Sequence, residues 1–172
     1  MIETPRLTIR RFAKTDAQDL FEYLSLPDTY LFEPGEPISL EEAHALASER
    51  SSGGSFFAVE LKGANRMIGH LYFDKIEPCY FMTWELGYIF NPRYHNKGYC
   101  SEAAKAIVDY GFSVLLAHRI VAHCNPLNCA SWKVLERIGM KREGHFKKMA
   151  FFRKDENGSP LWHDAYAYGL VE

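Results

Sequence analysis

The sequence predicts an α/β fold of the α+β kind, a mixed and mostly antiparallel sheet with about four helices on its faces. Three observations favour this class. Three strand-like runs follow one another across short turns in the middle of the chain. Amphipathic helical stripes occur on both sides of that block. Asn157-Gly158 separates two strand-like runs near the end, which is typical of a β-hairpin. The 172 residues are expected to form one domain, 1–172, because this length buries a sufficient core.

The first third of the chain is expected to supply one strand and two helices. Apolar and polar side chains alternate loosely over residues 7–12, which indicates an opening strand. A helix is expected to begin at Thr15-Asp16 and to end before Pro27. The segment SLEE, residues 39–42, has the capping-box pattern S-x-x-E and predicts a second helix.

The middle of the chain is expected to form a meander of three antiparallel strands, at residues 56–61, 67–76 and 80–90. An amphipathic helix follows Gly98, and a further strand is expected at residues 119–124. The apolar stripe of that helix consists of Ala103, Ala104, Ile107, Val108, Phe112 and Leu115.

The last third is expected to contain one more helix and the hairpin. The helix begins at either Asn128 or Ser131, since both residue types favour helix N-caps. Residues 145–154 and 160–171 are predicted to pair as a C-terminal hairpin. Its aromatic residues would leave an apolar face on which a homodimer could form.

Composition excludes several classes of function. The net charge is −2, with 22 acidic and 20 basic side chains, so neither nucleic acid nor a membrane is an expected partner. No signal peptide and no apolar run of about 18 residues is present, which predicts a cytoplasmic protein. The cysteines show no metal-site spacing, so we expect free thiols and no metal. They are Cys79, Cys100, Cys124 and Cys129.

The turn before the long helix has the chemistry of a phosphate site. The first backbone N–H groups of a helix lack partners and carry partial positive charge, so they attract anions. Gly98 permits a positive φ or a close approach that a Cβ would prevent. We therefore expect the N–H groups of about Asn96 to Ser101 to form a cradle for a pyrophosphate. The stretch matches neither a P-loop nor a G-x-G-x-x-G turn, so an ordinary strand–turn–helix remains the alternative.

Two segments, WELGYIFNPRYHNKGYCSEA and NPLNCASWKVLERIGMKREG, closely resemble the Gcn5-related N-acetyltransferase (GNAT) superfamily. The subgroup that includes the ribosomal-protein alanine N-acetyltransferases is the most similar, and the start TPRLTIRRF and the end WHDAYAYGL fit it too. The phosphate-binding signature of the family is [QR]-x-x-G-x-[GA], and here it reads HNKGYC, residues 95–100. Gly98 matches, whereas His95 and Cys100 depart from the pattern.

The resemblance implies transfer of an acetyl group from acetyl-coenzyme A (acetyl-CoA) to a primary amine by direct attack in a ternary complex. It also implies a sheet that splays beside the 80–90 strand, where free backbone groups hold the pantetheine and thioester. Glu85 is the implied general base, and Ser131 the implied proton donor to the leaving thiolate. The implied cofactor-binding residues are Gly87, Tyr88, Ile89, Phe90, His95, Asn96, Lys97, Gly98, Tyr99, Cys100, Ser101, Asn128 and Ser131.

Each of these roles has a structural alternative. Glu85 suits a surface strand, and Asn128 and Ser131 suit helix caps. No tyrosine lies near Ser131 in the sequence to donate the proton instead. None of His70, His118, His123 or His145 is assigned a catalytic role. The candidates for lining the acceptor pocket, several of them equally suited to the core, are Tyr72, Asp74, Tyr80, Phe81, Trp84, Trp162 and His163.

The acceptor is left open by the sequence. A protein N-terminal amine, a polyamine, an amino acid and an aminoglycoside are all compatible with it. A cationic acceptor would use the acidic residues Asp28, Glu33, Glu36 and Asp74. One rival function is a non-catalytic domain that binds coenzyme A for sensing or assembly. A phosphate-binding hydrolase or kinase is a weaker rival, because the chain lacks a P-loop and a nucleophile elbow.

Overall fold

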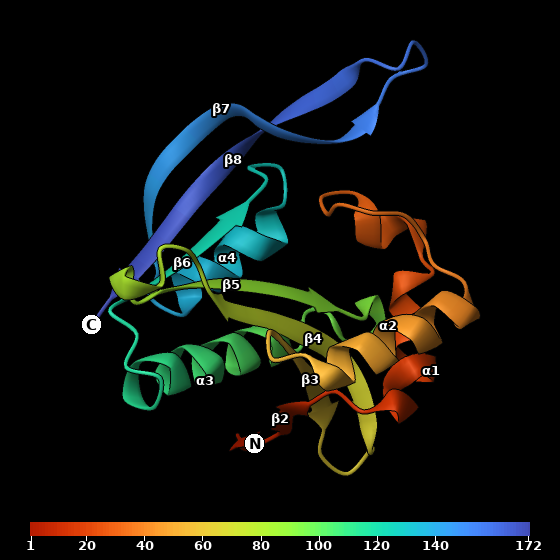
Figure 1. Cartoon of the computed structure of the whole chain (residues 1–172), viewed down its shortest axis with the longest axis vertical. Helices are drawn as coiled ribbons and strands as arrows, with labels where there is room; N and C mark the ends of the chain where they lie inside the picture. Colours follow the sequence, from red (N-terminus) through yellow and green to blue (C-terminus); the bar gives the residue numbers. More distant parts are fainter.

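The computed structural model describes all 172 residues and confirms the predicted class (Figure 1). One eight-stranded sheet has the order β1-β2-β3-β4-β5-β6-β8-β7. Every neighbouring pair is antiparallel except β5 and β6, which run parallel. The strands are β1 (Ile2–Glu3), β2 (Leu7–Arg11), β3 (Phe56–Leu61), β4 (Arg66–Lys75), β5 (Thr83–Phe90), β6 (Arg119–Cys124), β7 (Lys141–Lys154) and β8 (Pro160–Val171).

Four α-helices cover the sheet, two on each face (Figure 1). They are α1 (Ala17–Leu24), α2 (Leu40–Ser52), α3 (Tyr99–Ser113) and α4 (Cys129–Arg137). Helices α3 and α4 pack over the larger apolar cluster, and α1 and α2 over the smaller one. None of these helices combines the length and the apolar character that crossing a membrane requires.

Alternation along β4 assigns each face of the sheet to one pair of helices. Leu71 and Phe73 are buried in the cluster under α3 and α4. His70 points to the opposite face, where the hydroxyl of Tyr23 in α1 lies 2.6 Å from its Nδ1. Side chains on β5 follow the same rule, because successive residues of a strand point to opposite faces.

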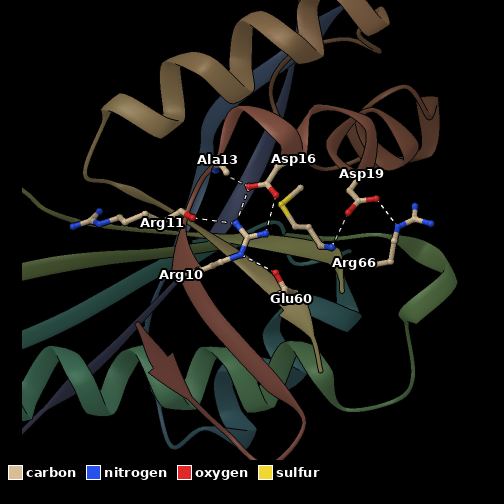
Figure 2. A network of polar contacts seen from close by, with 8 residues as sticks. Arg10, Arg11, Ala13, Asp16, Asp19, Glu60 and Arg66 are labelled. Carbon is tan, nitrogen blue, oxygen red and sulfur yellow. Dashed lines mark hydrogen bonds and ion pairs between the residues drawn. The ribbon is translucent and has the colours of Figure 1, made fainter. Parts of the chain in front are cut away.

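A network around Arg10 ties β2 to the segment that leads into α1 (Figure 2). The guanidinium of Arg10 donates to both carboxylate oxygens of Asp16 at 2.8 Å and to Glu60 of β3 at 2.8 Å. Asp16 is 4% exposed and also accepts the backbone N–H of Ala13 at 2.8 Å. The carboxylate therefore has three N–H donors, which compensates for its burial.

The parallel pair β5–β6 separates partway along its length. Pairing joins Thr83 to Arg119, Trp84 to Ile120 and Glu85 to Val121, and stops there. Beyond Glu85, β5 stays paired with β4 as far as Phe90, while its other edge has no strand partner. The splay implied by the family resemblance is thus present.

Most predicted elements lie where the periodicity placed them, with some corrections. Tyr80 and Phe81 do not extend β5, because Cys79–Phe81 forms a 3-10 turn and Met82 adopts a left-handed conformation before β5 begins. The first helix begins at Ala17, after a 3-10 turn at Lys14–Asp16.

The C-terminal hairpin is longer than predicted, because β7 begins at Lys141 rather than at residue 145. Together β7 and β8 form an arm that extends beyond the rest of the sheet (Figure 1). At the far part of the arm, Arg153 donates to the backbone oxygen of Tyr30 at 2.9 Å.

Candidate active site

Six consecutive backbone N–H groups at the start of α3 have no acceptor in the chain. They belong to residues 96–101, and none donates a backbone or side-chain hydrogen bond within the protein. The first donor with a partner is Glu102, whose N–H bonds the oxygen of Gly98 at 3.0 Å. Since α3 has no side-chain cap, its dipole adds positive potential to this row. We call these six groups the amide cradle.

The backbone of the amide cradle turns through left-handed conformations. Asn96 has a φ of +59°, and Gly98, the N-cap of α3, has a φ of +80°. His95 fixes the start of the turn, because its Nε2 lies 2.9 Å from the oxygen of Phe90 at the end of β5. Cys100 packs against the core, and burial raises the pKa of its thiol. Of the two residues that depart from the family signature, His95 thus holds the turn, and Cys100 lies in the first turn of α3 against the core.

Two arginines that the sequence analysis did not identify lie beside the amide cradle. Arg6 donates to the oxygen of Lys97 at 3.0 Å and stands 4.5 Å from the ring centroid of Tyr99. Arg137, at the end of α4, donates to the hydroxyl of Ser101 at 2.8 Å. Arg137 adds positive charge next to the free N–H groups, whereas the charge of Arg6 is balanced by an ion pair with Glu102 at 2.6 Å. The basic residue in TPRL and the last basic residue of α4 were the only available signals for them.

Helix α4 faces the free edge of β5 across the splay. Asn128 is its N-cap and accepts the N–H of Ser131 at 3.1 Å, which decides between the two predicted starts. The hydroxyl of Tyr88 donates to the backbone oxygen of Ser131 at 2.9 Å and lies 3.2 Å from its Oγ. The structure therefore brings a tyrosine to Ser131 that the sequence spacing did not reveal. Burial raises the pKa of Tyr88 well above its ordinary value, so this hydroxyl stays protonated.

Glu85, Gly87 and Ile89 lie on the face of the sheet that α1 and α2 cover, opposite Tyr88. Glu85 is paired with Asp74, and Gly87 with Tyr72, on β4. The carboxylate of Glu85 lies 3.2 Å from Nδ1 of His123 on β6, and both side chains are about one third exposed. Tyr72, Asp74, Glu85 and His123 thus gather around the place where β5 and β6 part.

A further carboxylate, that of Glu33, belongs to the connection between α1 and α2. Glu33 is partly buried and makes no ion pair or hydrogen bond. Burial raises its pKa from an ordinary 4.5 to about 7. Its charge acts on the hydroxyl of Tyr88 and on the thiol of Cys124, whose own pKa burial raises to about 11. Of the acidic residues predicted to bind a cationic acceptor, Glu33 is thus one whose charge acts on side chains of β5 and β6.

Several predicted pocket residues lie elsewhere. Trp84 is buried in the core under α3, on the face opposite Glu85, so it does not line the acceptor side. Tyr80 is 78% exposed in the turn before β5 and packs edge-to-face against Phe81. Trp162 and His163 belong to the arm, where they pack against Phe151 and Phe152.

The two faces of the splay offer different chemistry. One side has the amide cradle with two arginines, which suits a phosphate-bearing ligand. The free edge of β5 can bind an amide-containing chain by backbone hydrogen bonds, as an added strand would. The opposite side has carboxylates and an imidazole, which suit a cationic group and proton transfer.

Comparisons with known proteins agree with this geometry. Residues 6–141 match the family model of the acetyltransferase (GNAT) domain. The uncharacterized N-acetyltransferase YnaD of Bacillus subtilis is 40% identical over 99% of this chain and 96% of that protein. The crystal structure of a GNAT-family acetyltransferase from Bacillus anthracis superposes with a TM-score of 0.89, at 38% identity, covering 99% of this chain and 97% of that one.

A more distant relative represents the subgroup of the resemblance. The [ribosomal protein uS5]-alanine N-acetyltransferase of Escherichia coli is 26% identical over 85% of this chain and 80% of that protein. Sequence, fold and site geometry therefore lead to one assignment: this chain belongs to the GNAT family and is an N-acetyltransferase.

Proposed function

We propose that this chain, acting as one domain over residues 1–172, transfers the acetyl group of acetyl-CoA to a primary amine by direct attack in a ternary complex. The observation that carries the proposal is the amide cradle at the splay, six N–H groups without an acceptor at the start of an uncapped helix. Unpaired donors of this kind favour an anion with several oxygens. The free edge of β5 begins at the same end of the site.

The residues of the cradle suit the pyrophosphate of coenzyme A. The N–H groups from Asn96 to Ser101 would hold its oxygens, with Lys97 and Arg137 close by to balance the charge. Arg6, which is paired with Glu102, would hold the backbone of the turn through the oxygen of Lys97. The pantetheine arm would lie along Gly87 to Phe90, between β5 and α4. Asn128 and Ser131 border that path at the start of α4.

The chemistry requires a neutral amine and a protonated leaving group. A lysine-like amine has a pKa of about 10.4 and an α-amine of about 8, so a proton must be removed before attack. Glu85, on the acceptor side of the splay, would take part in removing that proton. The departing sulfur would receive a proton from Ser131, whose hydroxyl lies 3.2 Å from that of Tyr88.

The acceptor side is acidic, which favours a cationic amine. Asp74 and Glu85 occupy paired positions on β4 and β5, so two carboxylates lie together on this face. A polyamine or the N-terminal amine of a protein carries the matching charge. Tyr72 supplies an aromatic surface beside Gly87 for the adjoining methylene groups or side chain.

The cellular setting and assembly are part of the same proposal. Cys79 and Cys129 are exposed free thiols, as is usual in the reducing cytoplasm. The arm exposes about half of the side chains of Phe146 and Trp162, so a second copy of this chain would bind there. Light scattering coupled to size exclusion would give the mass of a dimer if this is correct.

The test is calorimetric titration with acetyl-CoA, beside inorganic phosphate and ATP, followed by an acetylation assay. The acceptors are spermidine, free alanine, kanamycin and a peptide that begins with alanine. Saturable binding of acetyl-CoA together with turnover of one amine supports the proposal. Binding without turnover of any primary amine would favour the alternative, a coenzyme A-binding domain for sensing or assembly. No binding would refute the cradle.

A further inference from the structure

We propose that His123 accepts the proton of the attacking amine and that Glu85 acts on it as a positioning residue. This inference rests on the proposed function and assigns its proton-transfer step to a pair of residues. The carboxylate of Glu85 and Nδ1 of His123 lie 3.2 Å apart, on two strands that come from distant parts of the chain. Neither the strand-like pattern of residues 119–124 nor the family signature indicates a role for this histidine.

His123 lies where β5 and β6 separate. The last paired position of the two strands is Glu85 with Val121. Two residues further along, Gly87 of β5 and His123 of β6 stand on either side of the opening gap, on the same face of the sheet. Gly87 has no side chain there, and a Cβ would meet only Tyr72 at 3.4 Å. An amine that reaches the free edge of β5 from this face would pass beside the imidazole.

The contact with Glu85 determines which ring nitrogen of His123 is available. An ionised carboxylate only accepts hydrogen bonds, so Nδ1 carries the hydrogen and donates it. Nε2 then holds the lone pair, and it has no partner in the chain. The side chain of His123 is 37% exposed and lines an open cavity of about 220 Å³. This arrangement, with a carboxylate behind an imidazole, fixes the tautomer and stabilises the imidazolium that forms.

The proton and electron balance of the step is complete. The amine nitrogen forms a C–N bond with the carbonyl carbon of the thioester, and the C–S bond breaks with its electron pair leaving on sulfur. The proton lost by the nitrogen moves to Nε2 of His123 and then to solvent. The thiolate takes up one proton from Ser131, the proposed donor, and Ser131 regains a proton from solvent. Starting from the ammonium form of the acceptor, one proton is released per acetyl group transferred.

The other groups around His123 are compatible with this role. On β4, Asp74 and Tyr72 flank Glu85 and Gly87 and add negative charge and an aromatic ring. On the far side of the cavity, Arg119 and Glu143 form an ion pair with each other, and Tyr168 lines the wall. Arg119 is therefore paired, and the charged groups that face His123 from β4 and β5 are the carboxylates of Asp74 and Glu85.

The test compares His123→Gln and Glu85→Gln with the wild-type enzyme and with His118→Gln as a matched control. His118 lies one residue before β6, is exposed, and makes no side-chain hydrogen bond. We measure kcat and kcat/KM from pH 5 to 10, with spermidine and the alanine peptide as acceptors, and calorimetric binding of coenzyme A. Histidine proton NMR follows the titration of His123 directly in the wild type and in Glu85→Gln.

The expected result is a fall in kcat/KM of about 100-fold or more at pH 7 for His123→Gln, the range of a general base. High pH should recover part of it, where free amine is abundant. Glu85→Gln should lose less activity and should shift both the acid limb of kcat/KM and the NMR titration of His123 to lower pH. Coenzyme A affinity should stay unchanged in both variants, and His118→Gln should match the wild type.

Three results would overturn the inference while leaving the proposed function intact. One is full activity in His123→Gln, and another is a greater loss in Glu85→Gln than in His123→Gln, which would make Glu85 the base by itself. An NMR titration of His123 unaffected by Glu85→Gln would also refute the pairing. If the wild type transfers acetyl to no amine while binding coenzyme A, the proposed function fails first, and the inference fails with it.

Discussion

Gly98→Ala tests the amide cradle at the residue on which its shape depends. Gly98 has φ +80° and ψ 0°, a conformation that costs an L-residue about 1–2 kcal/mol. The only heavy atom within 4 Å of an added Cβ is Nη2 of Arg6 at 3.4 Å, at the end of a flexible side chain. The fold should therefore survive, with a melting temperature lower by about 2–8 °C for a chain of this length.

Binding should suffer more than stability. The added Cβ would stand among the free N–H groups of the cradle, where oxygens of the pyrophosphate must approach. A hydrogen bond to a charged group contributes about 1.5–3 kcal/mol. The loss of one such bond raises the dissociation constant of coenzyme A by about 10- to 150-fold, since 1.4 kcal/mol corresponds to a factor of ten.

Gly63→Ala is the matched control. Gly63 also has a φ of +80°, lies in the turn between β3 and β4, and has no heavy atom within 4 Å of an added Cβ. Both variants should lose similar thermal stability, measured by circular dichroism. Calorimetric titration with coenzyme A should separate them, with Gly63→Ala binding like the wild type. Equal affinity in Gly98→Ala and Gly63→Ala would refute the reasoning.

Four further predictions concern other parts of the site and fold. Asp16→Ala should cost about 1.5–3 kcal/mol in urea denaturation, because Arg10 loses its bonds to the buried Asp16 and keeps only Glu60 as a partner. A loss below 1 kcal/mol would show that the network in Figure 2 contributes little. Glu33→Gln should raise the melting temperature at pH 8 and leave it unchanged at pH 4. Burial raises the pKa of Glu33 in the folded protein to about 7, so the free energy of unfolding falls as the pH rises from 4.5 to 7. An equal effect of the substitution at both pH values would contradict this. Arg137→Gln should weaken coenzyme A binding and reduce its salt dependence, whereas Lys133→Gln on the same helix should change neither. Ser131→Ala should lower kcat without unfolding α4, because the cap of that helix is the side chain of Asn128; a fall in melting temperature with unchanged kcat would make Ser131 structural.

Much of the fold was predictable because its signals are local. The strands at Phe56–Leu61, Arg119–Cys124 and Pro160–Val171 have the predicted bounds, since alternation and turn residues define them within a few positions. The prediction failed at Tyr80, where aromatic residues continue a strand-like pattern through a 3-10 turn. Propensity does not distinguish an aromatic residue of a strand from one that packs against its neighbour in a turn.

The candidate site likewise has a part made of neighbouring residues and a part made of residues far apart in the sequence. The amide cradle is a run of neighbouring residues around Gly98, so its glycine and the helix start behind it were visible in the sequence. The contact of His123 with Glu85 joins residues 38 apart, and that of Tyr88 with Ser131 joins residues 43 apart. Arg6 reaches α3 from 96 residues away. No local pattern encodes such pairs.

The sequence by itself determined the elements, the helix N-terminus that offers free N–H groups, and the family. Each depends on periodicity, on the conformational freedom of one glycine, or on a motif, all of which are properties of short segments. Only the tertiary structure decided which charges surround the cradle, which tyrosine meets Ser131, and which histidine faces Glu85. Those contacts depend on where the pairing of β5 and β6 ends, and strand pairing sums interactions between distant parts of the chain.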